Sequence, residues 1–495
     1  MKMSRILKVM ALCLVLVMAF STLTACTNTS SNNTTAQSST PQKVKISIDE
    51  WIGYQNLLDA NGGLVTTPDS LNAKHGIYVE YVVMNNATDS SNALISGEIV
   101  GAGYTVNRYA FLQNKFDSAK LDVVMPFITN YSNGGDGIIA KSDIFSINDL
   151  VGKKVAVPRF SEAQTMVEWL LNNSSLSDAE RKQIRNNMVY FDTADETAKA
   201  FFSGSVDAAA TWEPYLTQAA SSTDSRVLFD TSMSTNLILS GIVFRQDFLA
   251  NNEDFMTKLI DAAFEASYMY KNEFSYIRQL PMFELMSDAE IIDMANGADL
   301  TNWAQNCKLL TDEAVVMYED MANVWITIGE SAVPSKAKTA FTDKYMQNLR
   351  SKYEGKETSS EKTFDNSDKN MIIESPESLL SYEADIKFEL NSYTIKSDSY
   401  AELDEFVKVA KVLDGVYIQI EGNASQRADG ITDEQITNFS LQRANAIAEY
   451  FVKQGIAEER LIVIGHGDSN PVNTENKAAP ENRRTEIFFK TKMGY

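Results

Sequence analysis

Short apolar runs separated by helical patterns recur from Val44 to about Gln347, and this alternation limits the folds that this part of the chain can adopt. Each run has the length of a buried strand and is too short for a buried helix. The clearest examples are Val79 to Val83, Val123 to Phe127, Val155 to Val157 and Val206 to Ala210. Strands that alternate with helices are typical of parallel sheets covered by helices, so we predict an α/β fold here.

A second folded region follows a polar stretch. At 495 residues the chain is longer than one hydrophobic core normally organises. Residues 354–378 are rich in Lys, Glu, Ser, Asp and Asn, and we predict a linker over residues 351–383. Beyond it, strands are expected at 386–390, 416–421, 460–464 and 484–489, with helices at 399–413 and 439–454. This pattern predicts a small α/β domain over residues 384–495.

The N-terminus has the layout of a secretory signal. Lys2, Arg5 and Lys8 precede an apolar run that is too short for a permanent membrane span. The segment Leu23-Thr-Ala-Cys26 resembles the bacterial lipoprotein box, which implies cleavage before Cys26 and a lipid anchor on that residue. Residues 1–25 are then the signal peptide and residues 26–42 an uncharged polar tether. The alternative is a plain cleaved signal with a stray cysteine.

Residue counts exclude several kinds of chemistry. The chain has two histidines and three cysteines, so histidine-based triads and the usual zinc sites lack ligands, and no disulfide framework is possible. We therefore expect no enzyme, no cofactor and no metal. The formal charge is −22, and it becomes −25 without the three basic residues of the signal, which argues against a nucleic-acid partner.

The segment from Phe201 to Pro214 indicates a ligand site. The apolar run Val206 to Ala210 reads as a buried strand, and Trp212 and Glu213 follow at its carboxyl end. Ligands of open α/β sheets bind at that end of the strands. Alternatively, Trp212 packs in the core and Glu213 caps the next helix ahead of Pro214.

The same segment, Gly204-x-Val-Asp-Ala-x-x-x-Trp-Glu-Pro214, resembles the nitrate/sulfonate/taurine/thiamine-precursor group of ABC-transporter substrate-binding proteins. Four further segments agree with this group in the expected order: Val44 to Tyr54, Asn92 to Gly103, Ser132 to Ala140 and Leu150 to Pro158. The resemblance covers residues 43–350. It implies a bilobed periplasmic-binding-protein-like receptor with a ligand cleft, a small anionic or zwitterionic solute, and an ABC permease as partner.

Candidate pocket walls follow the expected strands. Trp51 and Tyr54 come after the first strand, and Tyr104 and Thr105 occupy the same place after Gly101-Ala-Gly103. Ordinary core packing is the alternative for these aromatic residues.

Candidate anion contacts follow the strand that ends at Pro158. Ser161 opens a helix whose first amides can hold an anion, and Arg159 can offer a guanidinium to a sulfonate or carboxylate. The alternatives are a helix N-cap for Ser161 and a solvent-exposed position for Arg159. Some relatives are pyrimidine-forming enzymes that rely on histidine, but we expect His75 to be a cation at a helix end.

The tail resembles the OmpA C-terminal, peptidoglycan-binding family. The matching segments are Ser440-Leu-Gln-Arg-Ala444, Ile464-Gly-His-Gly-Asp-Ser-Asn-Pro471 and Asn482-Arg-Arg-Thr-Glu-Ile487. Relatives offer an aspartate to the ammonium of the stem diamino acid and an arginine to its carboxylate. Arg443 matches that arginine, whereas Ser425 stands where the aspartate is expected.

The resemblance leaves the strength of wall binding open. Asp429 is a candidate substitute for the missing carboxylate, and Asn482 and Arg483 are further candidate contacts. The alternative for Arg443, Asn482 and Arg483 is a structural role within the domain.

Together these features predict a lipoprotein of the cell envelope, held on the outer face of the cytoplasmic membrane or in a periplasm. It would capture a small solute for an ABC importer, while its tail associates with peptidoglycan. The alternative is a structural or sensory wall-attached lipoprotein without a transport role.

Overall fold

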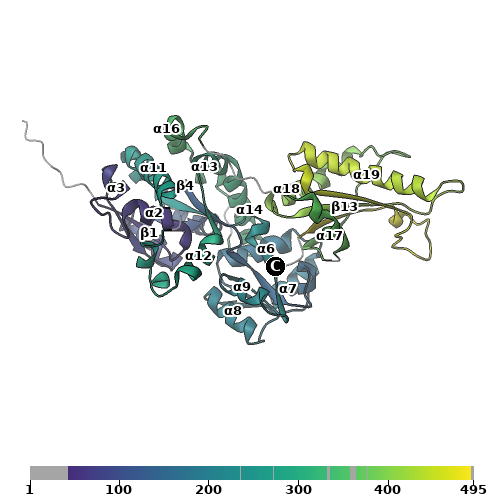
Figure 1. The fold of residues 1–495 in the computed structure, drawn as a ribbon, viewed down its shortest axis with the longest axis horizontal. Coiled ribbons are helices and arrows are strands. Elements are labelled where there is room, and N and C mark those ends of the chain that lie inside the picture. The colour runs from purple at the N-terminus through teal and green to yellow at the C-terminus, as the bar shows by residue number, and fades with distance from the viewer. Residues whose placement is uncertain are drawn as a thin grey trace, which may run out of the picture. The chain divides into compact units, whose positions relative to one another are not determined.

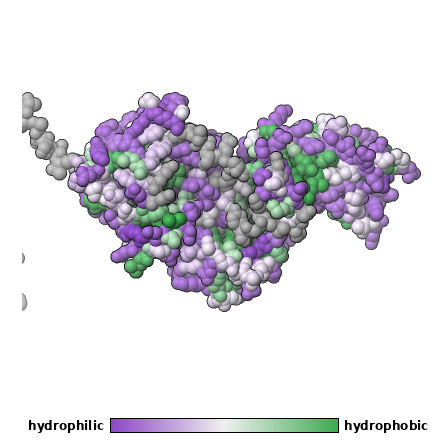
Figure 2. Space-filling view, viewed as in Figure 1, coloured by the Kyte–Doolittle hydropathy of each residue, from purple (hydrophilic) through white to green (hydrophobic). Residues whose placement is uncertain are grey.

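The structure is a computed structural model that describes residues 43–491, except 235, 271–272, 332–334, 357–363 and 376. The expected signal peptide, Cys26 and the tether lie outside the described residues. From Lys43 onward the chain forms one compact unit. Within the described ranges, no helix is both long and apolar enough to cross a membrane. The face of the molecule in Figure 2 is largely hydrophilic.

The first lobe is built on a mixed sheet with the strand order β11-β4-β10-β3-β1-β2. Its strands are β1 (Val44–Ile48), β2 (Val79–Val83), β3 (Gly101–Thr105), β4 (Val123–Ser132), β10 (Leu239–Arg245) and β11 (Ala298–Leu300). β1 pairs in parallel with β2 and β3, whereas β10 is antiparallel to β3 and β4. The sheet is therefore mixed, and not wholly parallel as the alternation suggested.

The second lobe has a sheet with the order β7-β6-β8-β5-β9. Its strands are β5 (Asp136–Lys141), β6 (Val155–Pro158), β7 (Met188–Phe191), β8 (Ala208–Trp212) and β9 (Ser225–Asp230). β6 runs parallel to β7 and β8, whereas β5 is antiparallel to β8 and β9. The strand expected at Val206 to Ala210 lies two residues later, so that Trp212 ends it.

Helices cover both sheets and connect the lobes. The first lobe carries α2 (Gln55–Asn61), α3 (Leu71–Lys74), α4 (Ala87–Ser96), α5 (Val106–Ser118), α10 (Gln246–Asn251) and α11 (Glu253–Met269). The second carries α6 (Glu162–Asn172), α7 (Asp178–Asn186), α8 (Ala194–Phe202) and α9 (Tyr215–Ala220). They are followed by α12 (Asp288–Asn296), α13 (Trp303–Lys308), α14 (Ala314–Thr327), α15 (Ala337–Ala340) and α16 (Lys344–Tyr353). α14 packs against α5 and α6, and so contacts both lobes.

The chain crosses between the two sheets where β4 leads into β5 and where β9 returns to β10. The first crossing is the short segment Ser132-Asn-Gly-Gly-Asp136. Gly134 in it has φ 93°, a conformation that glycine adopts without steric cost. Two lobes joined by short crossings can rotate against each other while each core stays intact.

The tail has its own sheet, with the order β12-β15-β13-β14. Its strands are β12 (Leu380–Ala384), β13 (Tyr417–Asn423), β14 (Leu461–Gly467) and β15 (Thr485–Lys490), and its helices are α17 (Lys369–Glu374), α18 (Tyr400–Val412) and α19 (Asp433–Lys453). α19 lies along β13 and β14 (Figure 1). The approach is close because a Cβ built on Gly422 would lie 2.2 Å from the Ser440 carbonyl oxygen. Glycine in β13 therefore lets the helix and the strand meet.

Two expectations for the tail need correction. No strand covers 386–390; Asn391 has φ 51°, and the chain there turns back on itself so that Phe388 bridges Ile395. β12 instead pairs with β15 from within the segment expected to be a linker. α17 also comes from that segment, and Ile372 is fully buried in it. Ile372 and the half-buried Phe364 therefore belong to the tail's core, whereas Met371 and Ile373 beside them are exposed.

Candidate functional site

The two lobes meet at the N-termini of α5 and α6. Arg108 on α5 donates to a carboxylate oxygen of Glu162 on α6 over 2.9 Å. Next to it, the Asn107 amide donates to the Thr165 hydroxyl over 2.9 Å. Both helices follow strands whose carboxyl ends face this junction, which is where α/β sheets bind ligands.

N-caps hold these two helices in place. The Thr105 hydroxyl accepts from the backbone N–H of Arg108 at 3.2 Å, and the Ser161 hydroxyl accepts from that of Gln164 at 3.2 Å. Ser161 therefore has the N-cap role that was its alternative in the sequence, and Thr105, which was named as a pocket wall, is also an N-cap. By capping they fix where Arg108 and Glu162 point.

Two further carboxyl groups lie at the junction. Asp49 directly follows β1, and its Oδ1 is buried with no hydrogen-bond partner among the described residues. Asp136 begins β5, is 4% exposed, and pairs in register with Trp212. Burial raises the pKa of each to about 7; the Arg108 charge opposes this at Asp49, and a hydrogen bond with Ser132 opposes it at Asp136.

Two of the expected aromatic walls are accessible and two are buried. Trp51 and Trp212 are half-buried, and the Trp51 indole N–H donates to Asn130 Oδ1 over 2.9 Å. Tyr54 is 1% exposed and Tyr104 is 2% exposed. The structure thus leaves Trp51 and Trp212 as candidate contacts and places both tyrosines in the core.

The remaining candidates of this region are engaged elsewhere. The Glu213 carboxylate accepts from the N–H and the hydroxyl of Thr217, at 3.1 and 2.9 Å, as the helix-capping alternative expected. Arg159 is half-exposed and forms an ion pair with Glu330 at 3.3 Å. The guanidinium at the lobe junction is that of Arg108, and not that of Arg159.

Sequence reasoning missed four charged residues at the junction: Asp49, Arg108, Asp136 and Glu162. Each lies within three residues of a named candidate or motif: Asp49 precedes Trp51, Arg108 follows Thr105, Glu162 follows Ser161, and Asp136 ends the Gly-Gly pair. The available signal was a charged residue within four positions of a strand end: Asp49, Arg108 and Glu162 follow β1, β3 and β6, and Asp136 begins β5. What the sequence lacked was any sign that these residues meet.

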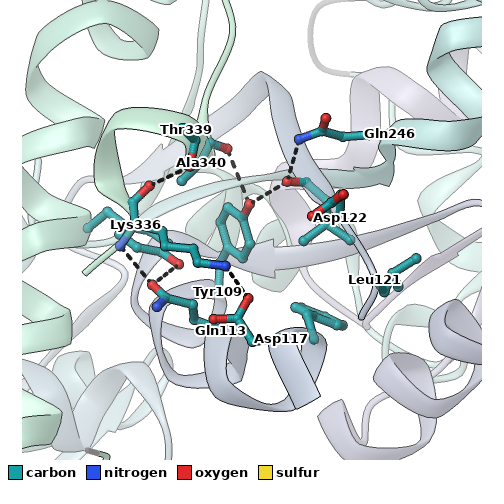
Figure 3. A pocket seen from close by; sticks show the side chains of 12 residues that line it. Tyr109, Gln113, Asp117, Leu121, Asp122, Gln246, Lys336, Thr339 and Ala340 are labelled. Carbon is teal, nitrogen blue, oxygen red and sulfur yellow. Dashed lines mark hydrogen bonds and ion pairs between the residues drawn. The ribbon is translucent and has the colours of Figure 1, made fainter. Parts of the chain in front are cut away.

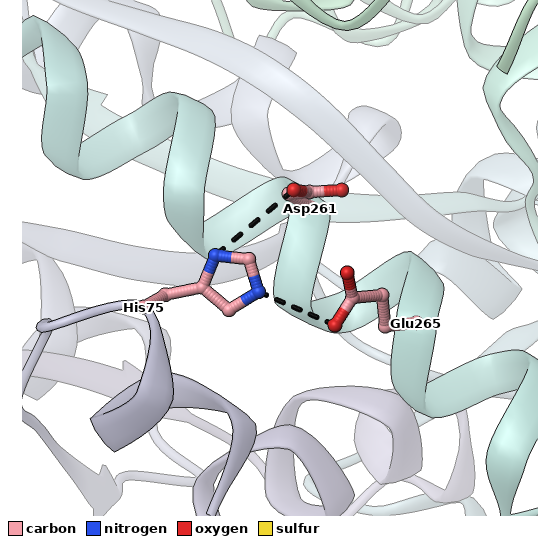
Figure 4. Close-up of side chains that lie close together, drawn as sticks. All are labelled: His75, Asp261 and Glu265. Atoms are coloured by element: carbon pink, nitrogen blue, oxygen red, sulfur yellow. Dashed lines mark hydrogen bonds and ion pairs between the residues drawn. The ribbon is translucent and has the colours of Figure 1, made fainter. Parts of the chain in front are cut away.

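A second cluster of charged side chains surrounds His75, which ends α3 as expected (Figure 4). Its Nε2 lies 3.3 Å from Glu265 and its Nδ1 lies 4.0 Å from Asp261. The Lys352 ammonium lies 2.6 Å from Asp261 and also pairs with Glu265. This lysine already supplies the cation that the two carboxylates need, so the cluster ties α3, α11 and α16 together.

A cavity of about 60 Å³ lies beside α5 and is separate from the lobe junction (Figure 3). The Tyr109 hydroxyl donates to the Ala340 carbonyl over 3.3 Å, and Lys336 pairs with Asp117 at 2.5 Å. The space suits a few water molecules between these polar groups.

In the tail, Arg443 lies between two aromatic rings. Its guanidinium carbon is 4.8 Å from the centre of Phe388 and 4.5 Å from that of Phe439. Its Nε donates to the Ser392 carbonyl over 3.1 Å. Stacking holds the plane of the guanidinium and leaves its terminal nitrogens for a ligand.

A second guanidinium lies close to the first. Arg483 donates to the Ser425 hydroxyl over 3.2 Å. Burial and the charge of Arg483 lower the pKa of Arg443. Neither arginine forms an ion pair within the described part of the chain, and Asp429 is exposed without an ion-pair partner there. Asp429 therefore stays a candidate for the place of the missing carboxylate.

Asn482 is fully buried. Its amide donates to the carbonyls of Asn473, Asn476 and Lys477, and its oxygen accepts from the Asn473 N–H at 2.8 Å. The side chain is enclosed by the loop it organises, contrary to the expectation of direct ligand contact. The structural alternative holds for this residue.

Comparisons with known proteins agree with both regions. Residues 72–272 match the family described as NMT1/THI5 like, and residues 387–485 match the OmpA family. The periplasmic aliphatic sulphonate binding protein SsuA from Escherichia coli has a similar fold, with a TM-score of 0.50 and 16% identity over 62% of this chain and 99% of that one. The expected fold class and both resemblances are confirmed.

The tail has curated relatives. The peptidoglycan-associated lipoprotein of Pseudomonas putida is 31% identical over 102 residues, which are 20% of this chain and 59% of that protein. Outer membrane porin F of Pseudomonas fluorescens is 24% identical over 106 residues, 21% of this chain and 32% of that protein. This chain thus spans less than two thirds of the length of either relative.

Proposed function

We propose that this chain, which joins an NMT1/THI5-like region to an OmpA-family region, is the extracytoplasmic solute-binding lipoprotein of an ABC importer. The observation that carries the proposal is the lobe junction. Buried polar groups from two separate sheets converge there at the carboxyl ends of strands, next to Trp51 and Trp212. Polar groups beside a few aromatic faces are what a small-molecule site requires.

Capture then needs closure and no covalent step. A solute between the lobes contacts both of them, and so favours the closed arrangement in which Arg108 reaches Glu162. A permease that binds the closed form would accept loaded receptors in preference to empty ones.

Lipid on Cys26 would hold the receptor at the outer face of a membrane, and residues 26–42 would give it reach. The name of one relative of the tail, the peptidoglycan-associated lipoprotein, together with Arg443 and Arg483, supports association with peptidoglycan through a carboxylate of the wall.

A ligand screen tests the receptor role. The chain from Lys43 onward is heated with and without sulfonates, nitrate, bicarbonate, carboxylates, amines and pyrimidines, since a ligand of the folded state raises the melting temperature. A saturable rise with one chemical class supports the receptor. No rise with any class, in well-folded protein, favours the second candidate, a structural or sensory wall lipoprotein.

Wall association is tested separately. We expect the protein to cosediment with isolated peptidoglycan, and Arg443→Met with Arg483→Met to abolish this without changing solute binding. Lys408→Met, which removes an exposed cation of the same domain, is the control. Sedimentation that survives the double substitution would refute the arginine site.

A further inference from the structure

The charges at the lobe junction are unequal in sign. Asp49 and Arg108 come from the first lobe, and Asp136 and Glu162 come from the second. The junction thus holds three carboxyl groups and one guanidinium, with Asp49 and Glu162 near Arg108 and Asp136 near Glu162. A solute that bridges the lobes must be compatible with this excess of carboxyl groups over guanidinium groups.

The guanidinium is not free to take an anion. Arg108 is bonded to Glu162 over 2.9 Å, and their side chains are only 23% and 14% exposed. An anion that took Glu162's place would leave a buried carboxylate unpaired, which is costly. It would also lie close to Asp49 and Asp136.

The other polar groups at the junction offer acceptors. Asp49 Oδ1 and Asn107 Oδ1 are both buried without a hydrogen-bond partner in the described part of the chain. Asn107 is fully buried, and its amide nitrogen is used by Thr165. Asn130 cannot donate to a ligand, because its amide nitrogen already donates to Gly53 and Thr129. Its oxygen accepts from Trp51.

Buried acceptors without donors favour a ligand that supplies the donors. We propose that the solute of this receptor carries a positively charged, hydrogen-donating nitrogen group, an ammonium or an amidinium, that lies between Asp49 and Asp136, with an apolar body against Trp51 and Trp212. This inference rests on the receptor function proposed above. Of the anionic or zwitterionic solutes expected from the sequence, it sets aside those without a cationic group, such as nitrate or a simple sulfonate.

A zwitterion fits only if its ammonium enters the junction and its acid group stays outside. A bound cation favours the ionised form of Asp49 and Asp136, whose pKa burial raises to about 7, whereas an anion placed there is repelled by the carboxylates. The half-buried indoles of Trp51 and Trp212 add faces on which a cation or a flat ring can rest.

The test is calorimetric titration of the chain from Lys43 onward with a matched panel. Benzamidine, benzylamine and butylamine are compared, in that order, with benzoate, phenylmethanesulfonate and butanesulfonate, which share their carbon frames. We expect the tightest binder to be a cation, with its anionic counterpart bound at least roughly tenfold more weakly. A tightest binder that is an anion overturns this inference and leaves the receptor role intact. No binding by any member overturns both.

Substitutions test whether Asp49 and Asp136 are the residues that bind the cation. Asp136→Asn and Asp49→Asn keep the shape of each side chain, and each is expected to weaken the tightest cation by roughly tenfold, while the affinity for anions stays the same or rises. Asp293→Asn, which removes an exposed carboxylate on α12, is the control and should change affinity less than about twofold. Cation affinity that is unchanged in both variants contradicts the proposal.

Discussion

At the scale of single residues, burial decides the protonation of Asp49 and Asp136. Each has a pKa of about 7 in the folded chain, against an ordinary value of 3.8. Between these values the folded chain binds protons that the unfolded chain has released. The free energy of unfolding must therefore fall as pH rises from about 4 to about 7, and this contribution is lost above that range.

This dependence gives a prediction for Asp136→Asn. The amide does not titrate, so the variant should lose less stability than the natural chain as pH rises through that range, and the two stabilities should differ most above pH 7. Each pKa unit corresponds to about 1.4 kcal/mol. Urea unfolding at a series of pH values measures the difference. Parallel pH profiles for the two proteins would show that Asp136 is ionised throughout.

Ser425 stands where relatives of the tail have an aspartate, so the tail site lacks a carboxylate there. Ser425→Asp places a carboxylate beside Arg483, the side chain that now donates to the serine hydroxyl. We expect this change to raise affinity several-fold for stem peptides that end in an ammonium next to a carboxylate. Fluorescence anisotropy with labelled peptides measures it, and Ser425→Asn, which adds size without charge, is the control. Equal gains in both variants would exclude the electrostatic explanation.

At the scale of elements, the N-termini of α5 and α6 carry the contact between the lobes. Glu162→Gln removes the negative charge that pairs with the mostly buried Arg108 guanidinium. We expect solute affinity to fall by roughly tenfold or more, because the closed arrangement loses its ion pair.

The matched control for that variant is Glu330→Gln. It breaks the Arg159–Glu330 pair, whose side chains are 51% and 33% exposed, and exposed pairs contribute little. Titration of both variants with the same solute compares them. Equal losses in the two variants would mean that the lobe junction has no special role.

The elements also show what the sequence could and could not predict. The strand at Val79 to Val83 has the predicted bounds, because an apolar run between turns specifies a buried strand by itself. The strand expected at 386–390 is wrong, because the left-handed turn at Asn391 folds that segment back. Mixed strand order was also missed, since local periodicity carries no information about which strands pair.

For the site, local patterns pointed to strand ends near the lobe junction, but they did not single out the charged side chains that meet there. Thr105 and Ser161 were named for their place after strands, whereas Arg108 and Glu162, a few residues on, form the contact. These two residues are 54 positions apart, so only the packed lobes reveal that they meet. The caps, by contrast, follow from local hydrogen bonding, and Ser161 fulfils its predicted alternative.

At the scale of the whole molecule, closure of one lobe on the other is the central claim. A receptor without solute should populate arrangements in which Arg108 and Glu162 are apart, and a bound solute should shift the population to the closed form. Each lobe should keep its own core in both states, because the crossings that join the lobes are short and lie outside the sheets.

The most direct test is a distance measurement across the junction. Spin labels are attached to cysteines that replace Glu98 on the first lobe and Lys182 on the second, both exposed, in the chain from Lys43 onward with Cys307→Ser, which removes its remaining native cysteine. Pulsed electron resonance then reports the distribution of distances with and without the solute found by titration. We predict that saturating solute converts a broad distribution into a narrow one, and that Glu162→Gln opposes the change. Identical distributions with and without bound solute would contradict the account.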